Sequence, residues 1–306
     1  MTTILFVKTS SLGDVVHNCP AVSDVARALP GAAIDWVVEA PFAGIAAMHP
    51  AVRHVIPVAV RRWRSALWKP AVWSEMAQWR RELREERYDA VIDTQSLLKS
   101  ALISASALGR RHGLDRASAR EVLAPMFYDV RHRVPRGLHA VERNRRLAAQ
   151  ALGFSLSDSP DYGLRVPAGA KSSYAVLLTM TSRADKLWPD ERWVELARGM
   201  RMPTMLPWGS DAERERAQRI AEKAGGTAIP RRLSVDELAN LFVGAAAVVG
   251  LDTGLTHFAA ALGVPTVGIY CGSDPALTGI YGAPRASNVG ASGRAPDVAE
   301  VLKAIA

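Results

Sequence analysis

A cluster of polar side chains follows directly after an apolar run near the end of the chain. The segment 249–270, VGLDTGLTHFAAALGVPTVGIY, has the pattern of a strand, a tight turn, a helix and a second strand. Its turn and first helical residues include Asp252, Thr253 and His257. The first N–H groups of such a helix lack an internal acceptor and carry the positive end of the helix dipole, which favours a phosphate or diphosphate. The segment therefore predicts a site for a ligand with a charged part and a polyhydroxylated part.

A second polar turn, KTSSLGD, lies between a strand expected at 4–8 and a helix expected over 14–29. It fits neither the glycine-rich fingerprint of dinucleotide-binding folds nor the P-loop pattern. Gly13 permits a sharp bend or the close approach of a ligand. Asp14 stands at the expected helix start, where it is either a plain N-cap or a general base. The turn by itself favours the cap, so a catalytic role needs a further argument.

Residues 179–189, TMTSRADKLWP, form a third polar turn. Thr181 and Ser182 offer hydroxyl groups, and Lys186 offers a charge that can contact phosphate oxygens. The alternative is an ordinary polar loop with a solvated lysine. The loop follows an expected strand and so lies at the end of the second sheet where ligands bind, which supports a functional role.

The turn at 206–216 places Glu213 in the first turn of an expected helix. Glu213 could accept hydrogen bonds from ribose hydroxyls, or it could only interact favourably with the helix dipole. Leu233 opens another strand-to-helix connection, where it either covers a flat base or belongs to the core. Ser234 and Glu237 follow at capping-box spacing.

These turns are positioned by short apolar runs that alternate with helical patterns. Strands are expected at residues 4–8, 34–38, 54–58, 89–94, 174–180, 203–208, 227–230 and 264–270, besides the strand that ends at Gly250. Helices are expected at 14–29, 97–108, 139–152, 189–200, 211–224, 233–244, in THFAAALG and at 297–306. The segment 153–173 is rich in Gly, Pro and Ser and is expected to be a linker. The alternation predicts the α/β class, with two doubly wound parallel sheets whose carboxyl ends bind ligands.

The charge of the 306-residue chain is unevenly distributed. Residues 1–165 carry 23 basic and 16 acidic side chains, whereas residues 166–306 carry 15 and 14. The excess predicts an anionic partner for the first half, such as nucleic acid, an acidic membrane face or an acidic small molecule, unless it is only a solvated surface. Two cysteines give no support for a disulfide framework or a cysteine metal site. With no long apolar run and no signal-peptide pattern, a cytoplasmic protein is expected.

The stretch from 61 to 87 carries four tryptophans among many arginines, and Pro70 interrupts any single helix there. Such a basic aromatic segment can lie on an anionic membrane surface or bind a phosphorylated ligand. The alternative is a surface helix whose tryptophans pack inward. The basic excess of the whole first half favours contact with a membrane or a substrate.

Taken together, these turns resemble those of the family-9 glycosyltransferases, the bacterial lipopolysaccharide heptosyltransferases. The similar segments, in order, are KTSSLGDVVH, DWVVE, RRWR, YDAVID, HAVERNR, DKLWP, LPWG and DTGLTH. The similarity as a whole is spread from residue 4 to about residue 285. Each segment is a weak signal alone, but the ordered set is specific.

The resemblance implies a GT-B fold, in which two Rossmann-like domains face each other across a cleft. Residues 1–160 would bind the acceptor and 161–306 the donor, with the final helix packing there or back on the first domain. It also implies an inverting, metal-independent transfer of heptose from ADP-L-glycero-β-D-manno-heptose to the Kdo of Kdo2–lipid A, with an α-1,5 linkage and no cofactor. A location on the cytoplasmic face of the inner membrane, peripherally attached and without nucleic acid, would follow.

The resemblance further implies roles for individual residues. Asp14 matches the general base, and Lys186 would offset the charge of the departing ADP. Positions contacting the donor diphosphate match Thr181, Ser182, Lys186, Thr253, Gly254 and Leu255. Positions near the heptose match Asp252 and His257, the ribose contact matches Glu213, and the neighbour of the adenine matches Leu233. Candidate acceptor contacts are Ser10, Gly13, Arg61, Arg62, Arg64, Lys99, Arg120 and Arg143.

Two departures and three alternatives accompany this interpretation. Ser182 stands where close relatives carry Thr, which preserves the hydroxyl, and Thr179–Met180 replaces a pair that usually resembles His-Ala. The nearest alternative is heptosyltransferase II or another family-9 transferase with a different core acceptor. A GT-B nucleotide-sugar epimerase would need no basic first domain. A non-catalytic membrane or nucleic-acid binder would leave the polar turns of the second half without a purpose.

Overall fold

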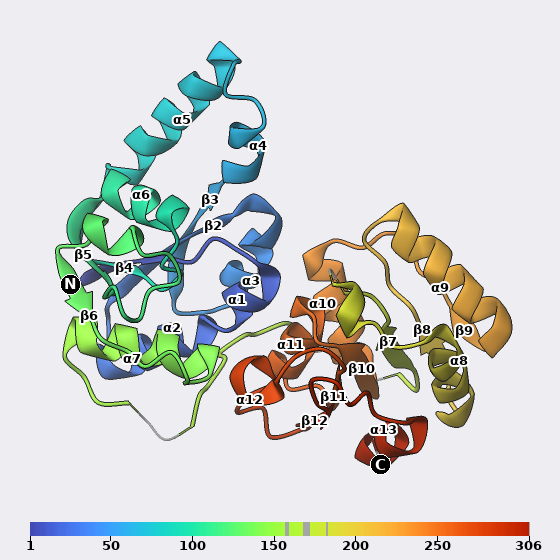
Figure 1. The fold of residues 1–306 in the computed structure, drawn as a ribbon. Coiled ribbons are helices and arrows are strands. Elements are labelled where there is room, and N and C mark those ends of the chain that lie inside the picture. Colours follow the sequence, from blue (N-terminus) through green and yellow to red (C-terminus); the bar gives the residue numbers. More distant parts are fainter. Residues whose placement is uncertain (157–158, 168–171, 182, 306) are drawn as a thin grey trace. The chain divides into compact units, whose positions relative to one another are not determined.

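The computed structural model describes residues 1–156, 159–167, 172–181 and 183–305. Its contacts divide the chain into two compact units, Met1–Leu164 and Arg165–Ala306. Each unit is built around its own parallel six-stranded sheet with flanking helices (Figure 1). The predicted α/β class with two doubly wound sheets is therefore confirmed. Within the described residues, no helix combines the length and apolar character needed to cross a membrane.

The first sheet has the strand order β3-β2-β1-β4-β5-β6, and all neighbouring strands are parallel. Its strands are β1 (Thr3–Val7), β2 (Ala33–Glu39), β3 (Val52–Val58), β4 (Arg87–Asp93), β5 (Leu108–Leu114) and β6 (Val130–His132). Its helices are α1 (Leu12–Val16), α2 (Cys19–Ala28), η1 (Ala40–Phe42), α3 (Ala43–Ala47), α4 (Val60–Arg64), α5 (Pro70–Leu83), α6 (Leu98–Ser106), η2 (Ala124–Phe127) and α7 (Ala140–Leu152). The order reverses between β1 and β4, so their carboxyl ends define the point where a ligand would bind.

The second sheet has the order β12-β11-β10-β7-β8-β9, again with parallel neighbours throughout. Its strands are β7 (Ala175–Leu178), β8 (Thr204–Met205), β9 (Thr227–Ala228), β10 (Ala247–Leu251), β11 (Thr266–Tyr270) and β12 (Ala286–Gly290). Its helices are η3 (Ala184–Lys186), α8 (Asp190–Gly199), α9 (Asp211–Ala224), α10 (Val235–Gly244), α11 (Gly254–Ala261), α12 (Pro275–Thr278) and α13 (Val298–Ile305). Here the order reverses between β7 and β10.

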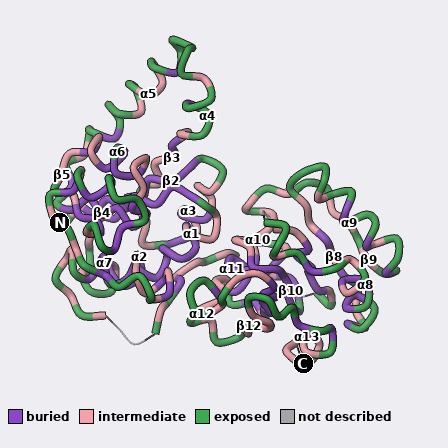
Figure 2. The backbone as a smooth tube through the Cα atoms, viewed as in Figure 1, coloured by how far each residue is buried: buried purple, intermediate pink, exposed green. Residues whose placement is uncertain are grey.

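Central strands form the core of each unit because both of their faces are covered by helices. All seven residues of β2 and all five of β10 and β11 are buried, as Figure 2 shows in purple. In the first unit, Arg145 of α7 donates to the buried Asp24 of α2 at 2.7 Å, which joins the two helices. In the second unit, α13 packs against α8 and β11, with Val298 and Val301 buried. The closing helix thus makes its principal contacts within the second unit.

Several boundaries differ from the sequence-based expectation. The single helix expected over 14–29 is wrong, because α1 and α2 are separate helices that break at His17 and Asn18. Pro20 lies in the first turn of α2 and cannot donate a helical hydrogen bond, which fixes a helix start there. Strands β5, β6 and β12 were not expected. They lie toward sheet edges, and β5, LGRRHGL, lacks the apolar pattern of a central strand.

Candidate active site

In the first unit, a set of side-chain hydrogen bonds joins the loop after β1 to the loop after β4. The N–H of Thr9 donates to Oε1 of Gln95 at 2.6 Å, and Nε2 of Gln95 donates to the carbonyl of Ser10 at 2.6 Å. Lys99, in the first turn of α6, donates to Oγ of Ser10 at 2.7 Å. Burial lowers the pKa of Lys99, against the opposing effect of Glu39. The loop that leads to Asp14 is therefore anchored from the neighbouring strand.

Asp14 is the third residue of α1 and not its N-cap, so the predicted capping position was wrong. Ser11 is the N-cap, and its N–H donates to Oδ2 of Asp14 at 3.0 Å. Nη1 of Arg120 approaches both carboxylate oxygens, Oδ1 at 3.4 Å and Oδ2 at 3.5 Å. Gly13 lies within the same helix, outside the left-handed backbone region. The carboxylate is 25% exposed, so it is held in place and still reachable by a substrate.

A buried lysine, which the sequence analysis did not select, supports this loop. Nζ of Lys8 donates to the carbonyl of Thr94 at 2.9 Å and to Oδ1 of Asn144 at 3.4 Å. Burial lowers the pKa of Lys8 to about 8, while the negative charge of Asp14 acts in the opposite direction. The sequence carried only a weak signal, a lysine directly after an apolar strand, and its burial follows from the packing of the fold around it.

Two arginines enlarge the positive charge on this side of the unit. Arg143 of α7 donates to the carbonyl of Ser118 at 2.5 Å. Its pKa is lowered by burial and by the neighbouring charges of Arg136 and Arg120. Of the predicted acceptor residues, Ser10 belongs to the loop that leads to Asp14. Lys99 contacts that loop at Ser10, and Arg120 contacts it at Asp14. Arg136 was not among the predicted residues.

The basic aromatic segment forms α4 and α5, which project from the first unit (Figure 1). The alternative of inward-packed tryptophans holds for part of the set, and contact with a membrane or a substrate stays a prediction. Trp63 is buried and packs edge-to-face on Trp79 at 5.8 Å, whereas Trp68 and Trp73 are 75% and 57% exposed. The predicted arginines of α4 are all exposed, and Arg62 forms an ion pair with Glu75 of α5.

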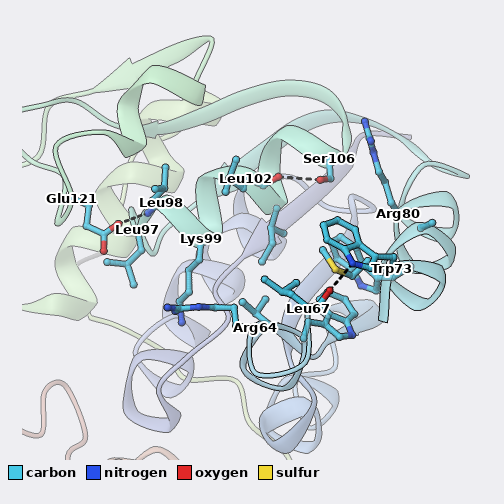
Figure 3. A pocket seen from close by; sticks show the side chains of 16 residues that line it. Arg64, Leu67, Trp73, Arg80, Leu97, Leu98, Lys99, Leu102, Ser106 and Glu121 are labelled. Atoms are coloured by element: carbon cyan, nitrogen blue, oxygen red, sulfur yellow. Dashed lines mark hydrogen bonds between the residues drawn. The ribbon is translucent and has the colours of Figure 1, made fainter. Parts of the chain in front are cut away.

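A pocket of about 860 Å³ lies between α4, α5 and α6 (Figure 3). Its wall is largely apolar, with basic side chains at its edge. The lining residues are Val60, Trp63, Arg64, Leu67, Trp73, Met76, Ala77, Trp79, Arg80, Leu97, Leu98, Lys99, Leu102, Ile103, Ser106 and Glu121. We refer to it as the α4–α6 pocket.

In the second unit, a buried carboxylate gathers three donors from three segments. Lys186 of η3 donates to Oδ2 of Asp252 at 2.6 Å, and the hydroxyl of Ser273 donates to the same oxygen at 2.5 Å. Nε2 of His257 lies 3.3 Å from Oδ1. Burial alone would raise the pKa of Asp252, but hydrogen bonds from His257, Lys186 and Ser273 hold it well below its usual range. The structure therefore brings together Lys186, Asp252 and His257, three of the residues predicted to bind the sugar nucleotide. Ser273 is a fourth member of the cluster, which the sequence analysis did not select.

Close backbone approaches fix this arrangement. The hydroxyl of Thr256 donates to the carbonyl of Leu251 at 2.6 Å, and a Cβ on Gly250 would lie 2.3 Å from that hydroxyl. A Cβ on Gly272 would lie 2.6 Å from the carbonyl oxygen of Asp185. The loops that carry Lys186 and Ser273 therefore touch, and each glycine leaves the space its neighbour needs.

The start of α11 lies beside this cluster. Thr253 is its N-cap with extended backbone, and its side chain makes no capping hydrogen bond. Gly254 and Leu255 occupy the first two helical positions, so their N–H groups have no acceptor within the helix. Three donor types thus converge at this end of the sheet: an ammonium group, hydroxyl groups and backbone N–H groups. Such a set suits a diphosphate.

The remaining predicted donor residues are more dispersed. Thr181 is partly buried and follows β7, and Ser182 lies outside the described residues. Glu213 accepts from the N–H of Gly209 at 2.6 Å, which holds the turn before α9. Leu233 is partly buried and immediately precedes the capping box of α10, whose two members are confirmed. Nothing in the described residues brings three His, Cys, Asp or Glu side chains into an arrangement that could hold a metal ion.

Comparison with known proteins gives concordant matches. Residues 76–303 match the family described as glycosyltransferase family 9 (heptosyltransferase). Lipopolysaccharide heptosyltransferase 1 of Pseudomonas aeruginosa is 49% identical over 289 residues, covering 91% of this chain and 81% of that protein. The structure of E. coli heptosyltransferase WaaC with ADP matches with a TM-score of 0.90 and 41% identity, covering 99% of this chain and 98% of that one. The same enzyme with ADP-2-deoxy-2-fluoro heptose matches with a TM-score of 0.87 and 40% identity, at the same coverage.

Proposed function

Because the chain belongs to glycosyltransferase family 9, the heptosyltransferases, we propose that it transfers L-glycero-D-manno-heptose to the Kdo of Kdo2–lipid A. The chain is a glycosyltransferase of lipopolysaccharide core biosynthesis, and ADP-heptose is its donor. Its fold is of the GT-B class. The acceptor and the α-1,5 linkage belong to the proposal, and they are supported by the heptosyltransferase 1 name of relatives at this level of identity.

The observation that carries the proposal is the cluster around Asp252 at the start of α11. Lys186 and the N–H groups of Gly254 and Leu255 are suited to the diphosphate, and Asp252 and His257 to the hydroxyls of the heptose. When the bond from the anomeric carbon to the diphosphate breaks, negative charge grows on the leaving ADP. Fixed donors already aimed at that position stabilise it, so the chemistry needs no metal ion.

In the first unit, Asp14 is proposed as the general base. It would remove the proton of a Kdo hydroxyl as that oxygen attacks the anomeric carbon from the face opposite the leaving ADP, which inverts the configuration. The new bond is carbon to oxygen, the broken bond leads to the diphosphate, and the proton passes to the carboxylate. Such positioned base assistance contributes about 10²–10⁴ in rate. The partial exposure of Asp14 and its fixed hydrogen bond to Ser11 support this role.

Acceptor recognition is proposed to rest on the basic residues of the first unit. Kdo carboxylates and lipid A phosphates are anionic, and Lys99, Arg120 and Arg143 lie around the Asp14 loop. The exposed arginines of α4 extend this charge outward. A peripheral position on the cytoplasmic face of the inner membrane follows from such an acceptor, with exposed Trp68 and Trp73 as further contacts.

The proposal is tested by incubating the protein with ADP-heptose and Kdo2–lipid A in the presence of a chelator, followed by mass analysis of the lipid. We expect addition of one heptose at an undiminished rate with chelator. A parallel reaction offers acceptor that already carries the first heptose. Product from that acceptor alone would identify a family-9 transferase acting later in core assembly, and loss of activity with chelator would contradict metal independence.

A further inference from the structure

The heptose transfer described above gives no role to the apolar wall of the α4–α6 pocket. We propose that it holds an acyl chain of the acceptor lipid while the sugar headgroup of the same molecule reaches Asp14. This inference rests on the proposed function, because it takes the acceptor to be an acylated, anionic glycolipid. It adds a lipid-binding site to the sugar-binding one.

The first argument is the apolar character of the pocket. Leu67, Trp73 and Leu102 contribute to its wall and are 42%, 57% and 50% exposed. Figure 3 shows them arranged around the same hollow, from the α4–α5 connection, α5 and α6. A gathering of exposed large apolar side chains is unusual on a protein surface and marks a binding site. The concave shape and a volume of about 860 Å³ suit a flexible hydrocarbon chain.

The second argument is charge. Arg64, Arg80 and Lys99 line the edge of the pocket. Glu121, which is the acidic member of the lining residues, accepts from the N–H of Leu98 at 2.5 Å. Basic side chains therefore outnumber the single acidic one in a lining that is otherwise largely apolar. That arrangement matches a lipid whose phosphate or carboxylate groups stand next to its chains.

The third argument is continuity with the Asp14 loop. Lys99 lines the pocket and also donates to Ser10 at 2.7 Å. Arg120 approaches Asp14 at 3.4 Å, and the next residue, Glu121, lines the pocket. Two separate segments thus connect the loop that carries Asp14 with the lining of the pocket. One amphiphilic molecule could place its sugar at Asp14 and a chain between α5 and α6.

A bilayer surface is the competing occupant. The most exposed aromatic side chain of this region is Trp68, which lies between α4 and α5 and does not line the pocket. A flat bilayer would meet such a protruding tryptophan, whereas a hollow between helices encloses a single chain. The charge and continuity arguments favour the acceptor's own chain, and the experiment distinguishes the two.

The test compares Kdo2–lipid A with its fully deacylated form, both presented with a fixed concentration of nonionic detergent. Leu102→Glu introduces a charge into the wall at a half-exposed position. We expect the KM for the acylated acceptor to rise about tenfold, the equivalent of losing contact with about two methylene groups. The KM for the deacylated acceptor should stay within about twofold of the wild-type value.

Val122→Glu is the matched control, because Val122 is 49% exposed and does not line the pocket. It should leave both KM values unchanged. An equal rise for both acceptors in Leu102→Glu, no rise at all, or the same rise in Val122→Glu would overturn the inference.

A second measurement does not depend on heptose transfer. Kdo2–lipid A with a photoreactive group at the end of an acyl chain is cross-linked to the full chain, and the labelled peptides are identified by mass spectrometry. We expect labelling of α5 and α6, and its loss in Ala77→Trp, which fills the pocket. Labelling confined to the peptide of Trp68 would assign the contact to a bilayer-like surface and refute the pocket. If neither acceptor is heptosylated, the proposed function is wrong. The labelling still tests whether the α4–α6 pocket binds an acyl chain.

Discussion

The carboxylates of Asp14 and Asp252 have different hydrogen-bond partners and different exposure, and these differences suit them to different roles. Asp14 accepts from the N–H of Ser11 and lies close to Arg120, yet a quarter of its side chain remains exposed. Asp252 is almost fully buried and receives three donors. The first arrangement keeps a proton acceptor accessible, whereas the second keeps a charge fixed. The two aspartates are therefore expected to respond differently to substitution.

Asp14→Asn should abolish transfer without loss of the fold, because the amide oxygen can still accept from Ser11. We expect turnover to fall by about 10²–10⁴, the usual contribution of a general base. The affinity for ADP, measured by titration calorimetry, should not change. A variant that retains more than about a tenth of wild-type turnover would show that Asp14 is not the base.

Lys186→Ala should weaken donor binding. The substitution removes a charged donor from the diphosphate position and leaves Asp252 with His257 and Ser273 as its remaining partners. Hydrogen bonds to charged groups contribute about 1.5–3 kcal/mol, so ADP should bind roughly 10–100 times more weakly. Lys223→Ala, which changes an exposed lysine of α9, serves as the control. Unchanged ADP affinity would remove Lys186 from the donor site.

Lys8 predicts a pH dependence of stability. The pKa of Lys8 is about 8 in the folded protein, lower than in the unfolded chain. At a pH between these two pKa values, Lys8 is therefore protonated more often in the unfolded chain than in the folded protein. Stability contributed by this residue therefore rises with pH from about 8 toward 10.5, by at most about 3 kcal/mol. Urea unfolding of wild type and Lys8→Met at pH 7.5 and pH 10 measures the difference. A gap between the two proteins that stays constant with pH would contradict this assignment.

At the scale of elements, the loops after five strands create both sites. The turns after β1, β7 and β10 were predicted from the sequence because each apolar run ends in a group of polar residues. The loop after β11 was not recognised, since Cys271-Gly272-Ser273 carries no strong chemical signal, and Ser273 acts only through a carboxylate distant in sequence. Gln95 was missed for the same reason, because its partners in the loop after β1 are set by strand pairing.

Gly272→Ala should disturb the donor site through the backbone. Its Cβ would lie 2.6 Å from the carbonyl oxygen of Asp185, so the loop that carries Lys186 would have to move. Crowding of this kind costs about 1–3 kcal/mol. We expect a lower thermal midpoint and severalfold weaker ADP binding. Gly137→Ala, where a Cβ would meet no atom within 4 Å, is the control. Wild-type ADP affinity in Gly272→Ala would show that the two loops are not coupled.

At the scale of the whole molecule, the alternation of apolar runs was sufficient to predict two doubly wound sheets, and both have the same strand order. Strands β5, β6 and β12 were not predicted, because strands at or near a sheet edge are partly exposed and tolerate polar residues, although the edge strands β3 and β9 were predicted. The uneven charge was visible in the composition, with 23 basic and 16 acidic side chains in residues 1–165. Which of those basic residues surround Asp14 depends on the fold.

Reversing two charges on α4, in Arg61→Glu with Arg64→Glu, should raise the KM for the acceptor about tenfold at low salt and flatten its salt dependence. The KM for the donor should not change. Arg81→Glu with Arg84→Glu, in the last turn of α5 and at its C-cap, alters the net charge equally at two other exposed positions and is the control. Steady-state kinetics between 50 and 300 mM salt, about the range over which screening grows, measures both effects. An effect confined to the donor would contradict an acceptor role for α4.

The ion pair between Lys186 and Asp252 has a consequence for how the sugar nucleotide arrives. Asp252 holds the lysine in an ordered position, so this long side chain does not have to be immobilised when the ligand binds. The aspartate, in turn, meets the incoming polyanion with its own charge balanced, which reduces repulsion at short range. The binding site is thus preorganised before the sugar nucleotide binds. The conformational entropy of ordering these two side chains was lost when the protein folded.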